Sequence, residues 1–274
     1  MQPQAGEVGE QMGAGSSLVR PVHGALTQAG NIVELFVDVV RNTFRRPFQF
    51  REFIEQAWFI ASVTILPTAL VAIPFGAVVS LQTGSLIKQL GAESFTGAAS
   101  VLAVIQQGSP IVTALLIAGA AGSAVTADLG SRTIREEIDA MEVLGINPIQ
   151  RLVVPRVLAM VLVALLLNGL VSVIGIAGGY FFNVVLQGGT PGAYLASFSA
   201  LAQLPDLYVA ELKAAIFGLI AGVVASYKGL HPGAGPKGVG EAVNQTVVIT
   251  FLLLFFANLI LTMVYLQIVP AKGS

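Results

Sequence analysis

Four long stretches of this chain contain no Asp, Glu, Lys, Arg or His. They lie between Glu55 and Lys88, between Glu93 and Asp128, between Arg156 and Asp206, and between Glu241 and Lys272. A helix needs about 20 apolar residues to cross a hydrocarbon core of about 30 Å, and each stretch is longer than that. Because lipid offers the backbone no hydrogen-bond partners, such stretches fold as helices. The pattern therefore predicts an all-α integral membrane protein.

These stretches, with a weaker apolar segment after Asp206, predict five membrane-spanning helices. We place them at residues 56–82, 97–127, 155–186, 207–228 and 245–269. The fourth span has Glu211 and Lys213 in its first turns, and we expect both side chains to reach out to an interface. Prolines inside the first two spans predict kinks: Pro67, Pro74 and Pro110.

A different pattern precedes the first span. Between Asn31 and Arg46, polar and charged residues occupy one face of a helix, and apolar residues occupy the other: Ile32, Leu35, Phe36, Val39, Val40 and Phe44. We predict an amphipathic helix over residues 27–47 that lies in the membrane interface, with packing on a soluble partner as the alternative. Residues 1–26 have no apolar core, so we expect a disordered cytosolic tail and not a signal peptide.

The basic residues predict the orientation. With the N-terminus in the cytoplasm, eleven Lys and Arg residues lie inside, and only Lys88, Lys213 and Lys272 lie outside. Basic residues are enriched in cytoplasmic segments. We therefore expect a multi-pass protein of the inner or plasma membrane, with a cytoplasmic N-terminus and an extracytoplasmic C-terminus. The composition agrees, since 11% of the residues are charged, against about 25% in soluble domains.

Several classes of function find little support in this sequence. There is no cysteine, and His23 and His231 are the only histidines, so neither a metal centre nor a nucleophile–base pair is predicted. No Gly-Lys dipeptide occurs, so the chain has no P-loop and we predict no ATPase site of its own. No basic cluster suggests nucleic acid. Ion-coupled carriers need ionisable groups inside the membrane, and we expect none near the midplane.

Small residues recur four positions apart in three of the spans. They are Ala114, Ala118 and Gly122 in the second span, Gly175 and Gly179 in the third, and Gly218 and Gly222 in the fourth. Small residues at this spacing let helix backbones approach closely in lipid. Packing within the subunit and dimerisation are both open.

The cytosolic segment at residues 128–154 joins the second and third spans. Thr133 and Glu136 fit a capping box, and Gly145 and Pro148 mark a stop, so we predict a helix over about residues 134–144. One stripe of this helix is apolar: Ile134, Ile138, Met141 and Leu144. A short helix of this kind fits docking into a groove on a soluble partner. It also fits a connecting helix that rests on its own bundle, and the pattern leaves both open.

The same segment resembles a known family. The run REEIDAMEVLGINPIQRLVVPR is similar to the signature of the MlaE/YrbE permeases, the membrane subunits of lipid-transporting ABC systems. TADLGSRTI, FRRPFQFREF and KGVGEAVNQTVV also match, so the resemblance covers about residues 44–268. EIDAMEVLG and FRRPFQ resemble the actinobacterial (mycobacterial) YrbE proteins of Mce systems, in particular the A-type paralogue.

The resemblance implies the partners and the activity. It implies an interfacial helix with five membrane helices, a second YrbE-type permease subunit as a heterodimer partner, a cytosolic ABC ATPase dimer, and Mce-domain proteins on the outer side. The chain itself would bind no cofactor, and the ATPase would use ATP and Mg. The substrate would be a lipid such as a fatty acid, a mycolic acid or a sterol, moved across the envelope by import. A carrier without ATP coupling and a structural anchor for the outer Mce assembly are the alternatives.

Two groups of residues are candidates for these roles. The resemblance assigns ATPase docking to the helix with Glu136 and Glu137, and the helix pattern adds Arg135, Ile138, Asp139, Met141 and Glu142. The kinked first two spans and the last span suggest an apolar substrate path near Phe75, Leu81, Gln106, Pro110 and Phe255. For the glutamine, an interhelical hydrogen bond is the alternative to a substrate role.

Overall fold

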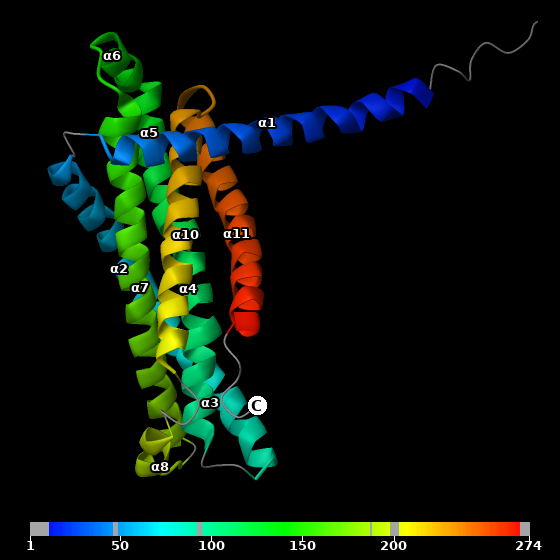
Figure 1. The fold of residues 1–274 in the computed structure, drawn as a ribbon, viewed down its shortest axis with the longest axis vertical. Coiled ribbons are helices and arrows are strands. Elements are labelled where there is room, and N and C mark those ends of the chain that lie inside the picture. Colours follow the sequence, from blue (N-terminus) through cyan, green and yellow to red (C-terminus); the bar gives the residue numbers. More distant parts are fainter. Residues whose placement is uncertain (1–10, 46–48, 92–94, 187, 198–202, 269–274) are drawn as a thin grey trace, which may run out of the picture.

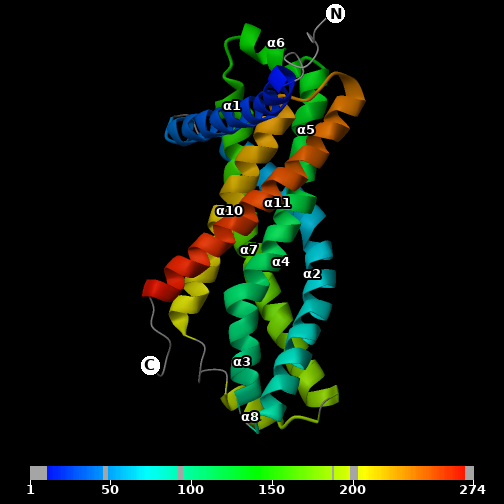
Figure 2. The same ribbon diagram turned by 90° about the vertical axis from the view of Figure 1, so that its right-hand side faces the viewer.

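The computed structural model describes residues 11–45, 49–91, 95–186, 188–197 and 203–268. Its spans stand side by side, and α1 lies across one end of the bundle, close to α6, while α8 lies at the other end (Figures 1 and 2). Five helical segments are long and apolar enough to cross a membrane: Phe50–Ile87, Thr96–Ile134, Ile149–Leu186, Leu204–Leu230 and Gly235–Ile268. The predicted all-α fold with five spans is confirmed.

The elements follow one another along the chain as helices and short π-helical turns. They are α1 (Gln11–Thr43), α2 (Phe50–Gln89), α3 (Thr96–Ala103), η2 (Val104–Gly108), α4 (Ser109–Leu116), η3 (Ile117–Ala121), α5 (Gly122–Ile134), α6 (Glu137–Val143), η4 (Ile149–Val153), α7 (Val154–Phe181), η5 (Phe182–Leu186), α8 (Pro191–Ala196), α10 (Leu204–Leu230) and α11 (Gly235–Ile268). All five spans begin before the predicted residue. The predicted bounds mark the apolar part of each span. The helical hydrogen bonds begin earlier in the chain, among polar or charged residues that precede the apolar part.

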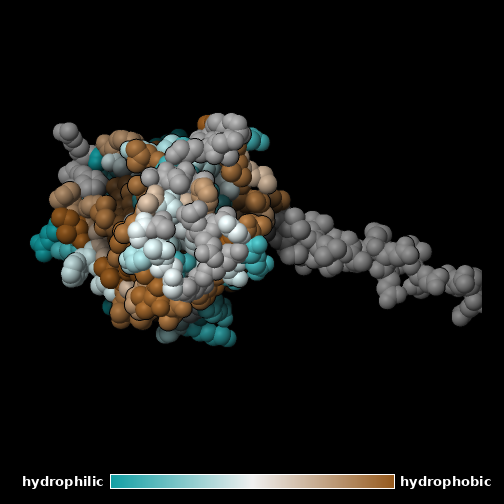
Figure 3. Space-filling view, turned by 90° about the horizontal axis from the view of Figure 1, so that it is seen from below, coloured by the Kyte–Doolittle hydropathy of each residue, from teal (hydrophilic) through white to brown (hydrophobic). Residues whose placement is uncertain are grey.

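The third span, α7, lies at the centre of the bundle. It packs along α2 on one side and along α10 on the other, and α11 packs on α5 and α10. Only 11% of the most apolar part of α11 is buried within this chain, whereas 61% is buried in the second span. Seen from the α8 end, apolar residues lie at many places around the bundle (Figure 3). This surface suits lipid or a membrane-embedded partner.

Close helix crossings depend on the small residues. A Cβ atom added to Gly76 of α2 would lie 2.3 Å from the carbonyl oxygen of Gly175 in α7. One turn further along, Ser80 Oγ donates to the Gly179 carbonyl oxygen at 2.9 Å. A Cβ atom added to Gly218 would lie 2.7 Å from the Met160 carbonyl oxygen. These glycines therefore serve packing within the subunit, where van der Waals contact holds membrane helices together.

The prolines act differently in the first two spans. Pro67 and Pro74 lie inside α2, which continues through both as one helix. The second span is interrupted by the π-helical turns η2 and η3, and Pro110 stands directly after η2, in the first turn of α4. Proline lacks an N–H group and crowds the preceding turn, which favours such an irregular backbone.

Helix α1 begins at Gln11, well before the predicted boundary at residue 27, so residues 11–26 are helical rather than a disordered tail. Residues 1–10 lie outside the described part of the chain. A formed helix extends one hydrogen bond at a time, without needing an apolar face to do so. Leu35 and Val39 of α1 are buried against Val153, Val157 and Val223 of the bundle. Its place in the membrane interface stays a prediction.

Candidate functional site

The segment between the second and third spans, which we predict to be cytosolic, forms two helices with a sharp corner between them. Helix α5 continues to Ile134, and α6 begins only at Glu137. Glu136 has φ 60°, and in the part of the chain that the structure describes it is the only non-glycine residue with a positive φ. Such a left-handed residue costs about 1–2 kcal/mol. The predicted helix over about residues 134–144 is therefore present over Glu137–Val143, and it begins three residues later than predicted because the corner at Glu136 precedes it.

The predicted capping box is absent, because Thr133 has other partners. Its hydroxyl lies 3.0 Å from the carbonyl oxygen of Leu129 and 3.0 Å from that of Gly229 in α10. The hydroxyl thus holds the end of α5 to the neighbouring span. Sequence spacing cannot reveal this, since Gly229 is nearly a hundred residues away.

The predicted apolar stripe is divided between two surfaces. Ile138 is 7% exposed and belongs to the core of the bundle, and Met141 packs against the same core. These two residues hold α6 onto its own chain, and their predicted role as anchors for a partner stays a prediction. By contrast, Val143 is 88% exposed and Leu144 is 74% exposed. The apolar surface open to a partner is therefore at the end of α6.

The charged residues of the segment are divided in the same way. Glu137 is paired within the chain, with Arg135 at 3.2 Å and Arg132 at 3.9 Å. Glu136, Asp139 and Glu142 are exposed. Exposed acidic side chains and the exposed valine and leucine thus belong to the same short segment, which gives α6 a mixed apolar and acidic surface. We call Glu136, Asp139, Glu142, Val143 and Leu144 the α6 surface.

A cavity of about 560 Å³ opens beside the α6 surface. It is lined by Gln49, Met141, Gly145, Ile146, Asn147, Gln150 and Arg151. Arg151 Nη1 donates to Gln49 Oε1 at 2.7 Å, which joins η4 to the residue just before α2. The cavity therefore borders the first and third spans as well as the loop after α6.

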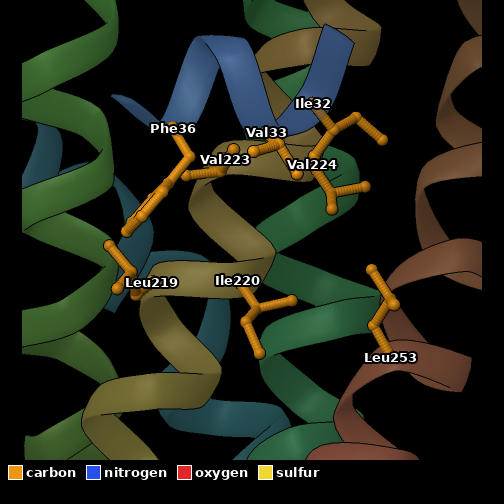
Figure 4. A pocket seen from close by; sticks show the side chains of 8 residues that line it. All are labelled: Ile32, Val33, Phe36, Leu219, Ile220, Val223, Val224 and Leu253. Carbon is orange, nitrogen blue, oxygen red and sulfur yellow. The ribbon is translucent and has the colours of Figure 1, made fainter. Parts of the chain in front are cut away.

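A second pocket, which is apolar, lies where α1 crosses the spans. Its volume is about 300 Å³, and every side chain that lines it is apolar: Ile32, Val33, Phe36, Leu219, Ile220, Val223, Val224 and Leu253 (Figure 4). The residues come from α1, α10 and α11. A pocket without a hydrogen-bonding side chain suits a hydrocarbon group and not a polar one.

The residues of the predicted substrate path are not brought together. Phe75 lies against Gly108, where an added Cβ atom would be 2.7 Å from the phenylalanine ring, and Pro110 is buried close by. Leu81 of α2 is 37% exposed and Phe255 of α11 is 62% exposed on the outer surface. Gln106 turns toward α10. Within one subunit the five residues therefore do not line a common groove.

Comparison with known proteins identifies the family. The family model described as Permease MlaE matches residues 53–264, which is most of the chain. The chain belongs to the MlaE permease family. The corner at Glu136 and the α6 surface lie in the matched region, as does most of each span, whereas most of α1 lies before it.

Several curated proteins are similar to this MlaE permease. A probable ABC transporter permease protein of Rickettsia bellii is 29% identical over 229 residues, which cover 84% of this chain and 88% of that protein. A protein with the same description from Synechocystis is 30% identical over 234 residues, 85% and 88% of the two chains. TRIGALACTOSYLDIACYLGLYCEROL 1, a chloroplastic protein of Arabidopsis thaliana, is 30% identical over 179 residues, 65% and 51% of the two chains.

These findings define the class of protein. The chain is a multi-pass membrane permease of an ABC transporter. An ABC permease implies an ATPase partner and another permease. The predicted membership of the MlaE permease family is confirmed.

The MlaE permease also contains a polar cluster that the sequence did not predict. Lys213 is 2% exposed, and its Nζ donates to Thr262 Oγ1 at 2.8 Å and to the Gln106 carbonyl oxygen at 3.2 Å. Gln106 Nε2 donates to Asp206 Oδ1 at 2.7 Å, and the Tyr265 hydroxyl donates to the same oxygen. These side chains line a cavity of about 80 Å³ and join η2, α10 and α11.

The cluster corrects one expectation and settles another. Lys213 does not reach out to an interface, because α11 and η2 supply oxygen acceptors inside the bundle. Glu211 likewise accepts a hydrogen bond from Asn168 Nδ2 at 3.0 Å. For Gln106, the interhelical hydrogen bond is observed. The sequence did hold one indication of this polar cluster: Asp206 and Lys213 lie seven residues apart, which places them on one face of a helix.

Proposed function

We propose that this permease is the membrane subunit of an ATP-driven lipid transporter of the Mce type. It pairs with a second YrbE-type permease and docks a cytosolic ATPase dimer. The N-terminus and the α6 surface face the cytoplasm, and Mce-domain proteins assemble on the outer side. The proposed direction is import. ATP and Mg bind to the ATPase, whereas this chain supplies the docking surface and the path through the membrane.

The α6 surface is the observation that carries this proposal. It lies outside the apolar spans, at the same end of the bundle as α1 (Figure 1). Val143 and Leu144 are largely exposed, whereas Ile138 on the same helix is buried against the bundle. Exposed apolar side chains together with acidic residues are typical of a docking site, where apolar contact gives affinity and charge gives orientation.

A lipid substrate is supported by the apolar pocket beneath α1 and by the apolar surface of the last span. The pocket beneath α1 has apolar side chains only (Figure 4). The exposed face of α11, with Phe255 and Ile260, offers apolar surface that a second permease subunit would cover. A substrate path between two subunits also accounts for the separation of Leu81, Phe255 and the buried Pro110 within one subunit. The Arabidopsis relative is named after a glycolipid.

Two double variants test the docking surface. Glu136→Ala with Glu137→Ala removes the paired acidic residues, and Val143→Ser with Leu144→Ser removes the exposed apolar residues. Full burial of one valine or leucine stabilises by about 1.5–3 kcal/mol, so the second variant should weaken ATPase binding by at least about tenfold. Glu34→Ala changes an exposed acidic residue on α1 and serves as the matched control.

The measurements are co-purification of the ATPase and uptake of labelled lipid by cells. Both should fall in the two double variants and remain at the wild-type level in the control. Wild-type values of both in the double variants would show that α6 is only a connection between spans. Lipid movement by the purified permease without ATPase would favour a carrier, and unchanged uptake after ATPase loss would favour a structural anchor.

A further inference from the structure

Arg156 is the largest fully buried side chain in the described part of the protein, with 0% of its surface exposed. It stands in the first turn of α7, where the third span begins. Its Nη2 donates to Asp128 Oδ2 at 2.5 Å, and its Nη1 donates to the Leu152 carbonyl oxygen at 2.9 Å. Nη1 also lies 3.7 Å from Glu52 Oε1 in α2. One guanidinium thus joins the first, second and third spans.

The contacts of Asp128 extend this junction toward α6. Its second carboxylate oxygen accepts a hydrogen bond from Arg132 Nε at 3.3 Å, one turn further along α5. Arg132 is in turn within 3.9 Å of Glu137, the first residue of α6. A chain of side chains with alternating charge therefore runs from the first span to the cytosolic helix: Glu52, Arg156, Asp128, Arg132, Glu137 and Arg135.

Burial increases from the α6 end of this chain to its centre. The side chain of Arg135 is 62% exposed, that of Glu137 43%, that of Asp128 28% and that of Arg156 0%. Water screens the outer pairs, so these are weak and easily exchanged. The Arg156–Asp128 pair is shielded, and its geometry is fixed by donors and acceptors on different helices. The inner pair is therefore the rigid part of the chain.

We propose that Arg156 is a positioning residue that transmits movement of α6 to the first and third spans, through Asp128 and Glu52. This inference rests on the proposed function, since it assumes that an ATPase moves α6. Ile138 and Met141 hold α6 to the bundle by apolar contacts, which allow sliding. A charged junction has directional contacts and does not slide without separating charges, so it carries a displacement from one helix to the next.

Substitutions of Arg156 separate transmission from docking, because the residue is buried and its contacts with Asp128, Leu152 and Glu52 involve no residue of the α6 surface. Arg156→Met removes the junction. Asp128 retains Arg132, and Glu52 retains its hydrogen bond from Gln56 Nε2 at 3.1 Å, so neither carboxylate is left without a partner. Arg156→Lys keeps the charge but has no planar group to reach Asp128 and Glu52 together. Asp128→Asn removes the partner charge from the other side.

The experiment uses the whole complex in proteoliposomes and measures three quantities: ATPase bound per permease, ATP hydrolysed, and labelled lipid moved. We expect ATPase binding to stay at the wild-type level, while lipid moved per ATP falls at least tenfold in Arg156→Met and Asp128→Asn. Arg156→Lys should give an intermediate ratio. Arg51→Gln is the control, because Arg51 is 93% exposed and pairs with Glu55 on its own helix.

The outcomes distinguish this inference from the proposed function. An unchanged ratio of lipid to ATP in both Arg156→Met and Asp128→Asn overturns the transmission role. So does loss of the ATPase from these variants, since the junction would then shape the docking surface. If Arg156→Met cannot be purified from the membrane, the lipid moved per ATP is compared in Asp128→Asn and Arg156→Lys instead, and a wild-type value in both overturns the transmission role. Wild-type complex without ATP-dependent lipid movement overturns the proposed function itself.

Discussion

The crossing of α2 and α7 gives the sharpest test of the packing. In Gly76→Ala, the new Cβ atom would lie 2.3 Å from the Gly175 carbonyl oxygen, whereas ordinary contacts begin at 3.4 Å. The helices must separate by about 1.1 Å, the difference between these distances. The hydrogen bond from Ser80 to Gly179, at 2.9 Å, would then lengthen to about 4 Å and be lost.

The expected cost follows from three contributions. Overpacking costs about 1–3 kcal/mol, and the lost hydrogen bond costs about 1 kcal/mol. Alanine recovers up to about 1 kcal/mol through its higher helix propensity. We therefore expect a loss of about 2 kcal/mol, which lowers the melting temperature by about 4–8 °C for a chain of this size.

The assay is thermal unfolding of the detergent-purified permease, monitored by size-exclusion chromatography of heated samples. Gly169→Ala in α7 is the matched control, because its added Cβ atom meets only Glu211 Oε1, at 3.9 Å. The control should keep the wild-type stability or gain up to about 1 kcal/mol from the higher helix propensity of alanine. Equal melting temperatures for Gly76→Ala and Gly169→Ala would refute the close crossing.

Three further predictions address other parts of the molecule. Asp206→Ala leaves the donors of Gln106, Tyr265 and the Gln203 backbone without their acceptor. The free energy of unfolding should fall by about 3 kcal/mol or more. A melting temperature unchanged from wild type would contradict the polar cluster. Glu136→Gly relieves a left-handed backbone and should stabilise the protein by up to about 1 kcal/mol. Glu142→Gly, inside α6, should destabilise it by about 1 kcal/mol. A lower melting temperature for Glu136→Gly than for Glu142→Gly would exclude the left-handed corner at Glu136. Cysteines at Gly235 and Lys272 should react with an impermeant reagent only from the cytoplasmic and the outer side, respectively, and labelling of both from one side would contradict the five-span orientation.

The sequence alone determined the membrane architecture. Charge-free stretches of more than 20 residues identified four of the five spans, because lipid excludes both charges and unpaired backbone groups, and a weaker apolar segment after Asp206 identified the fifth. The run REEIDAMEVLGINPIQRLVVPR identified the family, which the match over residues 53–264 confirms. Both are properties of contiguous residues, so they can be read without knowing which helices meet.

The roles of individual polar residues depended on contacts between distant segments. Thr133 looked like a helix cap, but its hydroxyl bonds Gly229. Lys213 looked like an interfacial charge, but Thr262 and Gln106 hold it inside the bundle. Ile138 and Leu144 looked equivalent on one helical stripe, but one is 7% exposed and the other 74%. The helical period places residues on a face, and only the packed neighbours decide what that face meets.

The same division explains what the tertiary structure added to the candidate site. Local sequence located the segment that joins the second and third spans, since its charges interrupt the apolar pattern. It did not reveal that Arg156 joins Glu52 and Asp128, residues that precede it by more than a hundred and by twenty-eight positions. A buried charge is stable only where partners from other helices surround it. The sequence thus determined which residues enter the membrane, and the packing of helices decided which of their polar groups are paired, buried or left open to a partner.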